Sequence, residues 1–161
     1  MNQINPIDKI NQILRQEIWL GSIGSQEDVR SLLTIFSEVW GAETLSELVT
    51  SLKDTECLLI KNNGAVVGYI FYGWDGREDF YEITDLGVLE SQRGKGFGCM
   101  LVSAVCAKSN KTKTNKVRLC VKADNPAKFV YEKLGFCCTQ TIQNYYGVNQ
   151  DGLRMEWAMR Q

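Results

Sequence analysis

A glycine-rich segment between a strand pattern and an apolar run constrains the fold of this chain more than any other feature. Residues 91–98 read SQRGKGFG, with glycine at positions 94, 96 and 98. They follow residues 82–88, which predict a strand, and lead into the apolar run 97–107, which predicts a buried helix. Glycines allow close backbone approach, and the N–H groups at a helix N-terminus favour anions. The segment therefore predicts a strand, a phosphate-binding loop and a helix.

The spacing of the glycines excludes two common phosphate-binding motifs. Counted from Gly94, the dinucleotide fingerprint G-x-G-x-x-G/A requires glycine or alanine where this chain has Cys99. The P-loop string G-x-x-x-x-G-K-[ST] does not occur. The pattern that remains is Arg93-x-x-Gly96-x-Gly98, which taken alone also fits a simple turn between a strand and a helix.

Two segments together carry a resemblance to a known family. The pattern Arg93-x-x-Gly96-x-Gly98 resembles the [QR]-x-x-G-x-[GA] acyl-CoA loop of the GNAT N-acetyltransferase superfamily. Residues 125–136, NPAKFVYEKLGF, resemble that superfamily's downstream segment, in which an Asn-led helix ends in Tyr-Glu-Lys-Leu-Gly-Phe. Both motifs occur in the expected order and spacing, so the chain is identified as similar to GNAT enzymes over roughly residues 17–160.

The second segment also predicts a short amphipathic helix whatever its function. Asn125 or Asp124 is the expected N-cap and Gly135 the expected C-cap. Its inward positions are Ala127, Val130, Tyr131 and Leu134. GNAT members usually place Asn and Tyr seven positions apart, whereas Asn125 and Tyr131 are six apart, so Asp124 occupies the position of the family's Asn.

The order of predicted elements is that of an α/β domain. Strands are expected at residues 17–22, 56–61, 65–74, 79–88 and 116–122, with two closing strands, and helices at 6–16, 26–40, 45–52, 97–107 and 125–134. Asn-Gly and Asp-Gly pairs at 63–64 and 75–76 mark hairpins. The resemblance implies a single GNAT domain over 1–161, with a mixed six- to seven-stranded sheet, flanking helices, and a V-shaped splay between the fourth and fifth strands. The amphipathic pattern of the N-terminal residues adds an extra helix at 1–16, before the usual start of the family.

Apolar side chains are expected on one face of three of these elements. In the helix capped by Ser25 they are Val29, Leu32, Leu33, Phe36 and Trp40, in the next helix Leu45, Leu48, Val49 and Leu52, and in the last strand Leu153, Met155, Trp157 and Met159.

Composition narrows the class of protein. The 161 residues carry a net charge of −1 with no long basic run, which gives no support to a nucleic-acid partner. No apolar run reaches membrane length and no signal peptide is evident, so we expect a cytoplasmic protein without a membrane partner. The six cysteines lie in apolar segments without C-x-x-C spacing, which favours buried reduced thiols. Histidine is absent, and no metal site is expected.

The resemblance assigns acetyl-CoA as the acyl donor and implies which residues contact it. In GNAT enzymes the donor lies in the splay, with backbone groups of the preceding strand on the pantetheine and acetyl carbonyl and the loop amides on the pyrophosphate. The corresponding residues here are Leu86, Gly87 and Val88 on the strand, the loop residues Arg93, Gly94, Lys95, Gly96, Phe97, Gly98 and Cys99, and Asn125. Simple core packing is the alternative role for Leu86 and Val88.

Amine acetylation needs a proton acceptor for the amine and a donor for the departing thiolate. By resemblance, Glu82 matches the base of histone-acetylating members, and Tyr131 matches the tyrosine that faces the CoA sulfur. Asp85 is the competing base, which strand alternation places on the opposite face unless a bulge intervenes. Glu82 could instead be a solvated strand residue, and Tyr131 a core aromatic.

The sequence constrains the identity of the acetyl acceptor less than that of the acetyl donor. Tyr145 and Tyr146, before an Asp-Gly and a Met-Glu strand, are faintly similar to hairpin tyrosines of protein N-terminal acetyltransferases, although paired tyrosines also occur as plain cross-strand packing. We therefore expect a monomer or homodimer that transfers the acetyl group directly to a primary amine in a ternary complex. The acceptor is a peptide or small-molecule amine, and the tyrosines favour a protein or peptide amine. The alternative is a non-catalytic acyl-CoA-binding sensor or interaction module.

Overall fold

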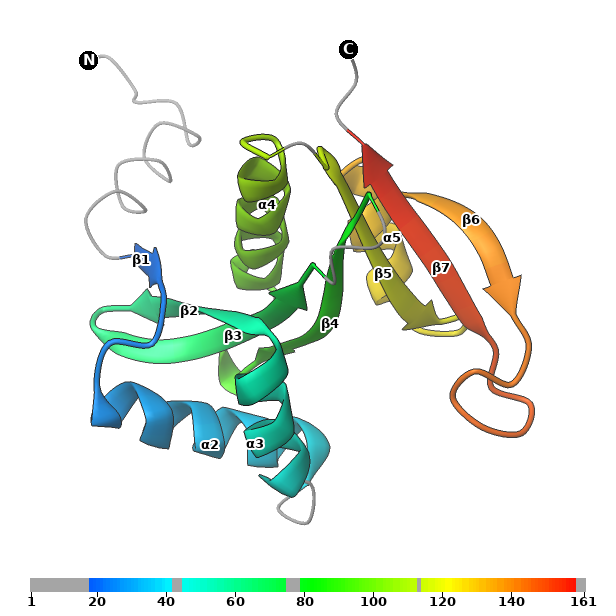
Figure 1. Ribbon diagram of the computed structural model, residues 1–161. Helices are drawn as coiled ribbons and strands as arrows, with labels where there is room; N and C mark the ends of the chain where they lie inside the picture. The colour runs from blue at the N-terminus through cyan, green and yellow to red at the C-terminus, as the bar shows by residue number, and fades with distance from the viewer. Residues whose placement is uncertain (1–17, 42–44, 75–78, 113, 159–161) are drawn as a thin grey trace, which may run out of the picture.

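A computed structural model describes residues 18–41, 45–74, 79–112 and 114–158 (Figure 1). The helix expected at residues 6–16, the turn at 75–76 and Met159 lie outside the described residues. The described helices are α2 (Gln26–Trp40), α3 (Leu45–Asp54), a short 3-10 turn η2 (Glu90–Gln92), α4 (Phe97–Ser109) and α5 (Ala127–Lys133). The strands are β1 (Ile18–Gly21), β2 (Glu56–Asn62), β3 (Ala65–Gly73), β4 (Tyr81–Val88), β5 (Lys116–Lys122), β6 (Cys137–Ile142) and β7 (Gly152–Ala158).

The seven strands form one mixed sheet in the order β1-β2-β3-β4-β5-β7-β6. The β4–β5 pair is parallel and every other neighbouring pair is antiparallel. The β2–β3 hairpin turns at Asn63 and Gly64, whose φ angles are 51° and 79°, as a turn with two left-handed central residues requires. The predicted α/β fold with a six- to seven-stranded mixed sheet is confirmed.

The parallel pair separates soon after it forms. β4 and β5 are paired only at Tyr81↔Val117, Glu82↔Arg118 and Ile83↔Leu119, although β4 continues to Val88. Figure 1 shows the two strands diverging, with α4 beside β4 and α5 behind β5. The splay predicted between the fourth and fifth strands is confirmed, and it leaves the second half of β4 without a neighbour on that edge.

A bulge in β4 alters which side chains share a face. Phe71 of β3 pairs with Asp85 and Tyr72 pairs with Ile83, so Thr84 is an extra residue without a partner in the ladder. Simple alternation would place Glu82 and Asp85 on opposite faces. The bulge brings both to the face covered by α2 and α3.

Two hydrophobic clusters lie on the two faces of the sheet. The larger cluster packs α4 against the strands and includes Leu101, Val105, Ile83 and Leu119. The smaller one packs α2 and α3 against β2 and β3, through Leu32, Phe36, Leu48 and Tyr69. In β7, Leu153, Met155 and Trp157 all pack against the larger cluster, as the alternating pattern predicts.

The predicted apolar stripes of α2 and α3 are partly wrong. Leu32, Ile35 and Phe36 are buried, whereas Val29, Leu33 and Trp40 are 36%, 37% and 51% exposed. The buried stripe continues to the partly buried Val39, so the helix contacts the sheet along positions 32, 35, 36 and 39. In α3, Leu48 is buried but Val49 is exposed.

The helix caps follow the sequence. The Ser25 hydroxyl accepts a hydrogen bond from the Asp28 N–H at 3.1 Å. Pro126 is the N-cap residue of α5, and Asn125 before it accepts a hydrogen bond at its Oδ1 from the Ala127 N–H at 2.9 Å, so the expected Asn125 side chain binds the first amide of the helix. Gly135 has a φ of 94° and closes the helix, with its N–H bonded to Glu132 and the Phe136 N–H bonded to Tyr131. Val130, predicted to point inward, is 39% exposed.

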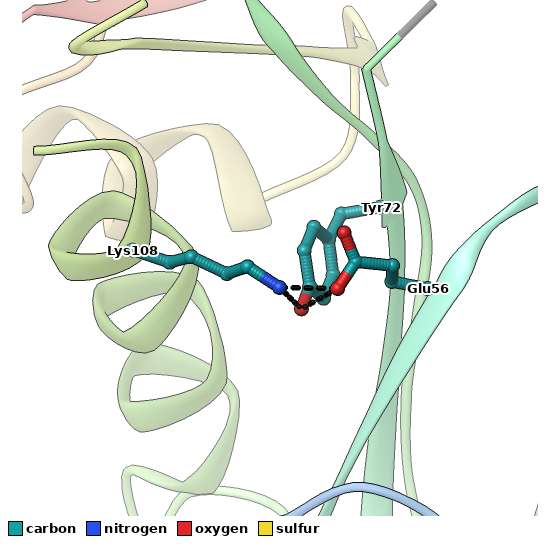
Figure 2. Close-up of polar contacts among 3 residues, drawn as sticks. All are labelled: Glu56, Tyr72 and Lys108. Carbon is teal, nitrogen blue, oxygen red and sulfur yellow. Dashed lines mark hydrogen bonds and ion pairs between the residues drawn. The ribbon is translucent and has the colours of Figure 1, made fainter. Parts of the chain in front are cut away.

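A polar cluster attaches the C-terminal half of α4 to the sheet (Figure 2). The buried Tyr72 donates a hydrogen bond from its hydroxyl to Glu56 Oε2 at 3.1 Å, and Lys108 Nζ donates to the Tyr72 hydroxyl at 3.0 Å and to Glu56. Burial is the main cause that raises the pKa of Tyr72. The cluster connects β2, β3 and α4.

The cysteines are all unpaired thiols, but the prediction that they are buried is only partly correct. Cys106 is buried, whereas Cys137 and Cys138 are exposed. The reason is their position in β6, which lies at the edge of the sheet and is exposed along nearly its whole length. No helix in the described part of the chain has the length and apolar character to cross a membrane.

Candidate active site

A cavity of about 780 Å³ lies where β4 and β5 separate. Its walls come from the end of β4, the glycine-rich loop, the start of α4 and one side of α5. A volume of this size is within the range of small-molecule and cofactor sites. The splay therefore produces a ligand-sized cavity beside the glycine-rich loop.

The glycine-rich loop leaves space for a ligand at the N-terminus of α4. Gly94 and Gly96 have φ angles of 77° and 87°, and a Cβ on either would contact nothing within 4 Å. Gly96 is the N-cap of α4 and provides no side-chain cap. The first backbone bond of the helix runs from the Met100 N–H to the Gly96 carbonyl at 3.0 Å. The preceding amides at positions 97–99 are thus the ones a bound anion could use.

The two cations of the loop have different surroundings. Arg93 Nε donates to the Val88 carbonyl at 3.1 Å, which fixes the loop against the end of β4. Lys95 Nζ donates to Gln92 Oε1 at 3.0 Å, and Lys95 is exposed. Arg93 lines the cavity and Lys95 does not.

The structure brings together most of the residues that are expected to contact acetyl-CoA. Those that line the cavity are Leu86, Gly87, Val88, Arg93, Gly94, Gly96, Phe97, Gly98, Cys99 and Asn125, together with Tyr131. Five further lining residues were not anticipated: Val39, Gln92, Pro126, Ala127 and Val130. Three of these belong to the α5 segment already recognised. Val39 comes from α2, and only the true register of the α2 stripe would have identified it.

Tyr131 reaches the cavity from α5. Its ring packs 6.0 Å from the ring of the buried Phe136, and it contacts the larger hydrophobic cluster. Burial raises the pKa of Tyr131 to about 12, and the charge of nearby Asp85 acts in the same direction. Tyr131 therefore remains protonated at neutral pH and can donate a proton or a hydrogen bond.

Asp85 is a partly buried carboxylate on β4 that does not itself line the 780 Å³ cavity, although the next residue, Leu86, does. Its Oδ1 accepts from the Leu86 N–H at 2.8 Å, and its Oδ2 accepts from the Tyr69 hydroxyl at 2.7 Å and from Trp40 Nε1 at 3.1 Å. Burial raises the pKa of Asp85, and these three donors partly oppose that effect. A carboxylate with a raised pKa suits a proton acceptor near neutral pH.

Glu82, the other candidate base, lies near the start of β4. It forms an ion pair with Arg118 at 3.2 Å, and it lines a separate cavity of about 190 Å³ with Thr84, Phe80 and Trp74. It does not line the cavity beside the glycine-rich loop, because that loop adjoins the opposite end of β4.

Tyr145 and Tyr146 lie in the β6–β7 connection and are 50% and 37% exposed. Their rings meet edge to face at 4.9 Å, and the Tyr146 hydroxyl donates to the Cys120 carbonyl at 2.9 Å. Tyr145 packs on Gly152, where a Cβ would lie 2.9 Å from the Tyr145 Cβ. Both residues lie outside the lining of the 780 Å³ cavity. Among the described residues, no cluster of three or more His, Cys, Asp or Glu side chains could hold a metal ion.

Comparison with known proteins agrees with this geometry. The model of the acetyltransferase (GNAT) family matches residues 27–136. Among solved structures, the ribosomal-protein-S18-alanine N-acetyltransferase from Escherichia coli is similar with a TM-score of 0.72 and 18% identity, covering 89% of this chain and 95% of that one. Ard1 from Thermoplasma volcanium has a TM-score of 0.72 and 21% identity, covering 90% and 99%. An aminoglycoside 6'-N-acetyltransferase complexed with coenzyme A has a TM-score of 0.75 and 14% identity, covering 89% and 98%. No significant match to a curated protein sequence was found.

Proposed function

Because the chain belongs to the acetyltransferase (GNAT) family, we propose that it transfers an acetyl group from acetyl-CoA to a primary amine. The acetyl group passes directly to the amine while both substrates are bound. The observation that carries this proposal is the cavity in the β4–β5 splay, which combines a helix N-terminus with Tyr131, a residue on which the charge of nearby Asp85 acts.

The residues of the cavity fit acetyl-CoA. The amides at the start of α4 and the Arg93 guanidinium suit a pyrophosphate, because oriented N–H groups and positive charge both favour an anion there. β5 does not pair with residues 86–88, so the backbone groups on this edge that Asp85 and Arg93 do not use are available to the amides of the pantetheine arm. One solved relative of this fold is described as a complex with coenzyme A, which is consistent with that role.

Two side chains supply the proton transfers. An alkyl amine has a pKa of about 10, so it arrives mainly as ammonium and must lose a proton before it attacks the thioester carbonyl. We assign the role of proton acceptor to Asp85 rather than to Glu82, since the charge of Asp85 acts on Tyr131 whereas Glu82 is paired with Arg118. Tyr131 donates a proton to the departing thiolate, because its hydroxyl stays protonated at neutral pH.

The acceptor in this proposal is a protein or peptide amine. Two of the similar structures are described as an S18-alanine N-acetyltransferase and Ard1, but another is an aminoglycoside acetyltransferase. Tyr145 and Tyr146, exposed in the β6–β7 connection, are the candidate contacts for the acceptor chain.

The test is acetyl transfer from acetyl-CoA to a panel of N-terminal peptides, lysine peptides, aminoglycosides and simple amines. The acetylated product is detected by mass spectrometry, because thiol reagents that report free CoA would also react with the exposed Cys137 and Cys138. We expect turnover with at least one class, and a peptide among the best acceptors. Tight acetyl-CoA binding without any transfer would instead support the non-catalytic sensor.

A further inference from the structure

We infer that Tyr69 and Trp40 are positioning residues for Asp85, which they hold in the orientation that accepts the amine proton. The inference rests on the proposed function and adds two residues to it. None of Tyr69, Trp40 and Asp85 lines the cavity, but Leu86 and Gly87, which follow Asp85 on β4, do. Tyr69 and Trp40 act through the Asp85 carboxylate, whose charge acts on Tyr131 in the cavity wall. The Tyr69 hydroxyl lies 2.7 Å from Asp85 Oδ2, and Trp40 Nε1 lies 3.1 Å from each of these two oxygens.

Tyr69 is held rigidly. It is 0% exposed, and its ring packs 6.0 Å from Phe36 and 5.1 Å from Phe71. It pairs with Gly87 in the β3–β4 ladder, and a Cβ at Gly87 would lie 2.4 Å from Tyr69 Cε1 and 2.9 Å from its hydroxyl oxygen. The ring therefore crosses β4 at the one position of the strand that has no side chain. Gly87 thus has a structural function in addition to its place in the cavity wall.

Trp40 connects the end of α2 to the same carboxylate. It is the last residue of the helix, and its preceding neighbour Val39 lines the cavity. Its indole N–H is shared between the Tyr69 hydroxyl and Asp85 Oδ2, each at 3.1 Å. Because Trp40 is 51% exposed, burial alone does not explain a tryptophan at this position.

Among the titratable side chains that face one another around Asp85, the Asp85 carboxyl group is the one that titrates below neutral pH. The titratable side chains facing it are Cys57 from β2, Tyr69 from β3 and Tyr131 from α5. Burial raises the pKa of Cys57 and of Tyr131 to about 12, and it raises the pKa of Tyr69 as well, so all three are neutral near pH 7. The three hydrogen-bond donors to Asp85 are also neutral. They stabilise the ionised carboxylate, so removing one raises the pKa of Asp85.

The experiment measures this carboxyl group directly in the full-length protein. Carbon-13 NMR of labelled aspartate follows the titration of Asp85, with Asp85→Asn to assign its signal, and the acid limb of kcat/KM is measured on the same samples. In Tyr69→Phe we expect both midpoints to move upward by about 1 pH unit, the size expected for one hydrogen bond to a charged group. Trp40→Phe should move both midpoints upward by a smaller amount, because the indole N–H is shared between Asp85 and the Tyr69 hydroxyl.

Tyr72→Phe is the matched control. Tyr72 is also a buried β3 tyrosine that donates to a carboxylate, but its partner is Glu56 (Figure 2). It should leave both midpoints unchanged. If Tyr69→Phe folds but does not move the Asp85 titration, the positioning inference is wrong. If Tyr69→Phe folds poorly, Trp40→Phe provides the same test, because Trp40 is half-exposed. A shift in the NMR midpoint without a shift in the acid limb would also overturn it, because Asp85 would not be the base. A wild type without any transfer contradicts the proposed function, while the NMR arm still decides whether Tyr69 and Trp40 hold Asp85.

Discussion

Gly96→Ala should separate the ligand-binding role of the glycine-rich loop from its backbone conformation. Gly96 has a φ of 87° with open space where a Cβ would lie. Alanine in this left-handed region costs about 1–2 kcal/mol of stability. For a chain of this length, that lowers the Tm by about 2–8 °C. The same alanine places a methyl group in the space we assign to the pyrophosphate.

Gly64→Ala is the matched control. Gly64 has a φ of 79° in the β2–β3 hairpin turn, also with nothing within 4 Å of where a Cβ would lie, and it is away from the cavity. The two variants should therefore lose similar stability without ligand. Acetyl-CoA at 100 times its Kd stabilises the native state by about 2.7 kcal/mol, which corresponds to a rise in Tm of about 5–11 °C. Gly64→Ala should retain this rise.

The assay is thermal unfolding of both variants and the wild type over a series of acetyl-CoA concentrations. We expect Gly96→Ala to need a much higher concentration for the same rise in Tm. An identical response in Gly96→Ala and Gly64→Ala would refute the assignment of this loop to the pyrophosphate.

Three further predictions concern single side chains. Tyr131→Phe should keep its Kd for acetyl-CoA but lower kcat by about 10- to 1000-fold in steady-state assays, as expected for loss of a positioned acid, and full activity would leave Tyr131 only a packing role. Gly87→Ala should cost about 1–3 kcal/mol in urea unfolding because its methyl group overlaps the Tyr69 ring, and a stability equal to that of the wild type would contradict this packing. The pKa of Asp28 is lowered by its hydrogen bond to Lys61 at 2.7 Å and by the Gly24 N–H. Its contribution to stability is therefore present above the pKa that Asp28 has in the unfolded state, and it is lost as the pH falls through the pKa of the folded state. Asp28→Asn should therefore reduce the loss of stability between pH 7 and pH 2, and an unchanged loss would show that this carboxylate is not coupled to folding.

The fold was predictable because its local signals agree with one another. Hairpin residues, helix caps and the glycine-rich loop each mark the start or end of an element. The order of strands and helices can therefore be predicted without knowledge of tertiary contacts. Ser25 caps α2, Asn125 binds the first amide of α5 and Gly135 ends that helix, as their residue types favour.

The parts that could not be predicted depend on contacts between distant segments. The register of the α2 stripe is set by how the helix sits on the sheet, and it buries Ile35 rather than Leu33. The bulge at Thr84 has no glycine to mark it, yet it decides that Asp85 faces Tyr69. Tyr69 itself reads as an ordinary apolar strand residue. Its role becomes visible only when Gly87 lies beneath its ring.

The most direct test of the central claim is the initial-rate pattern of acetyl transfer, with acetyl-CoA and the best amine acceptor both varied. Direct transfer in the β4–β5 cavity predicts intersecting double-reciprocal lines. With acetyl-CoA labelled in its acetyl group, it also predicts that the label is recovered on the amine and not on the protein. Parallel lines, with acetyl recovered as a thioester on Cys99, which lines the same cavity, would contradict it.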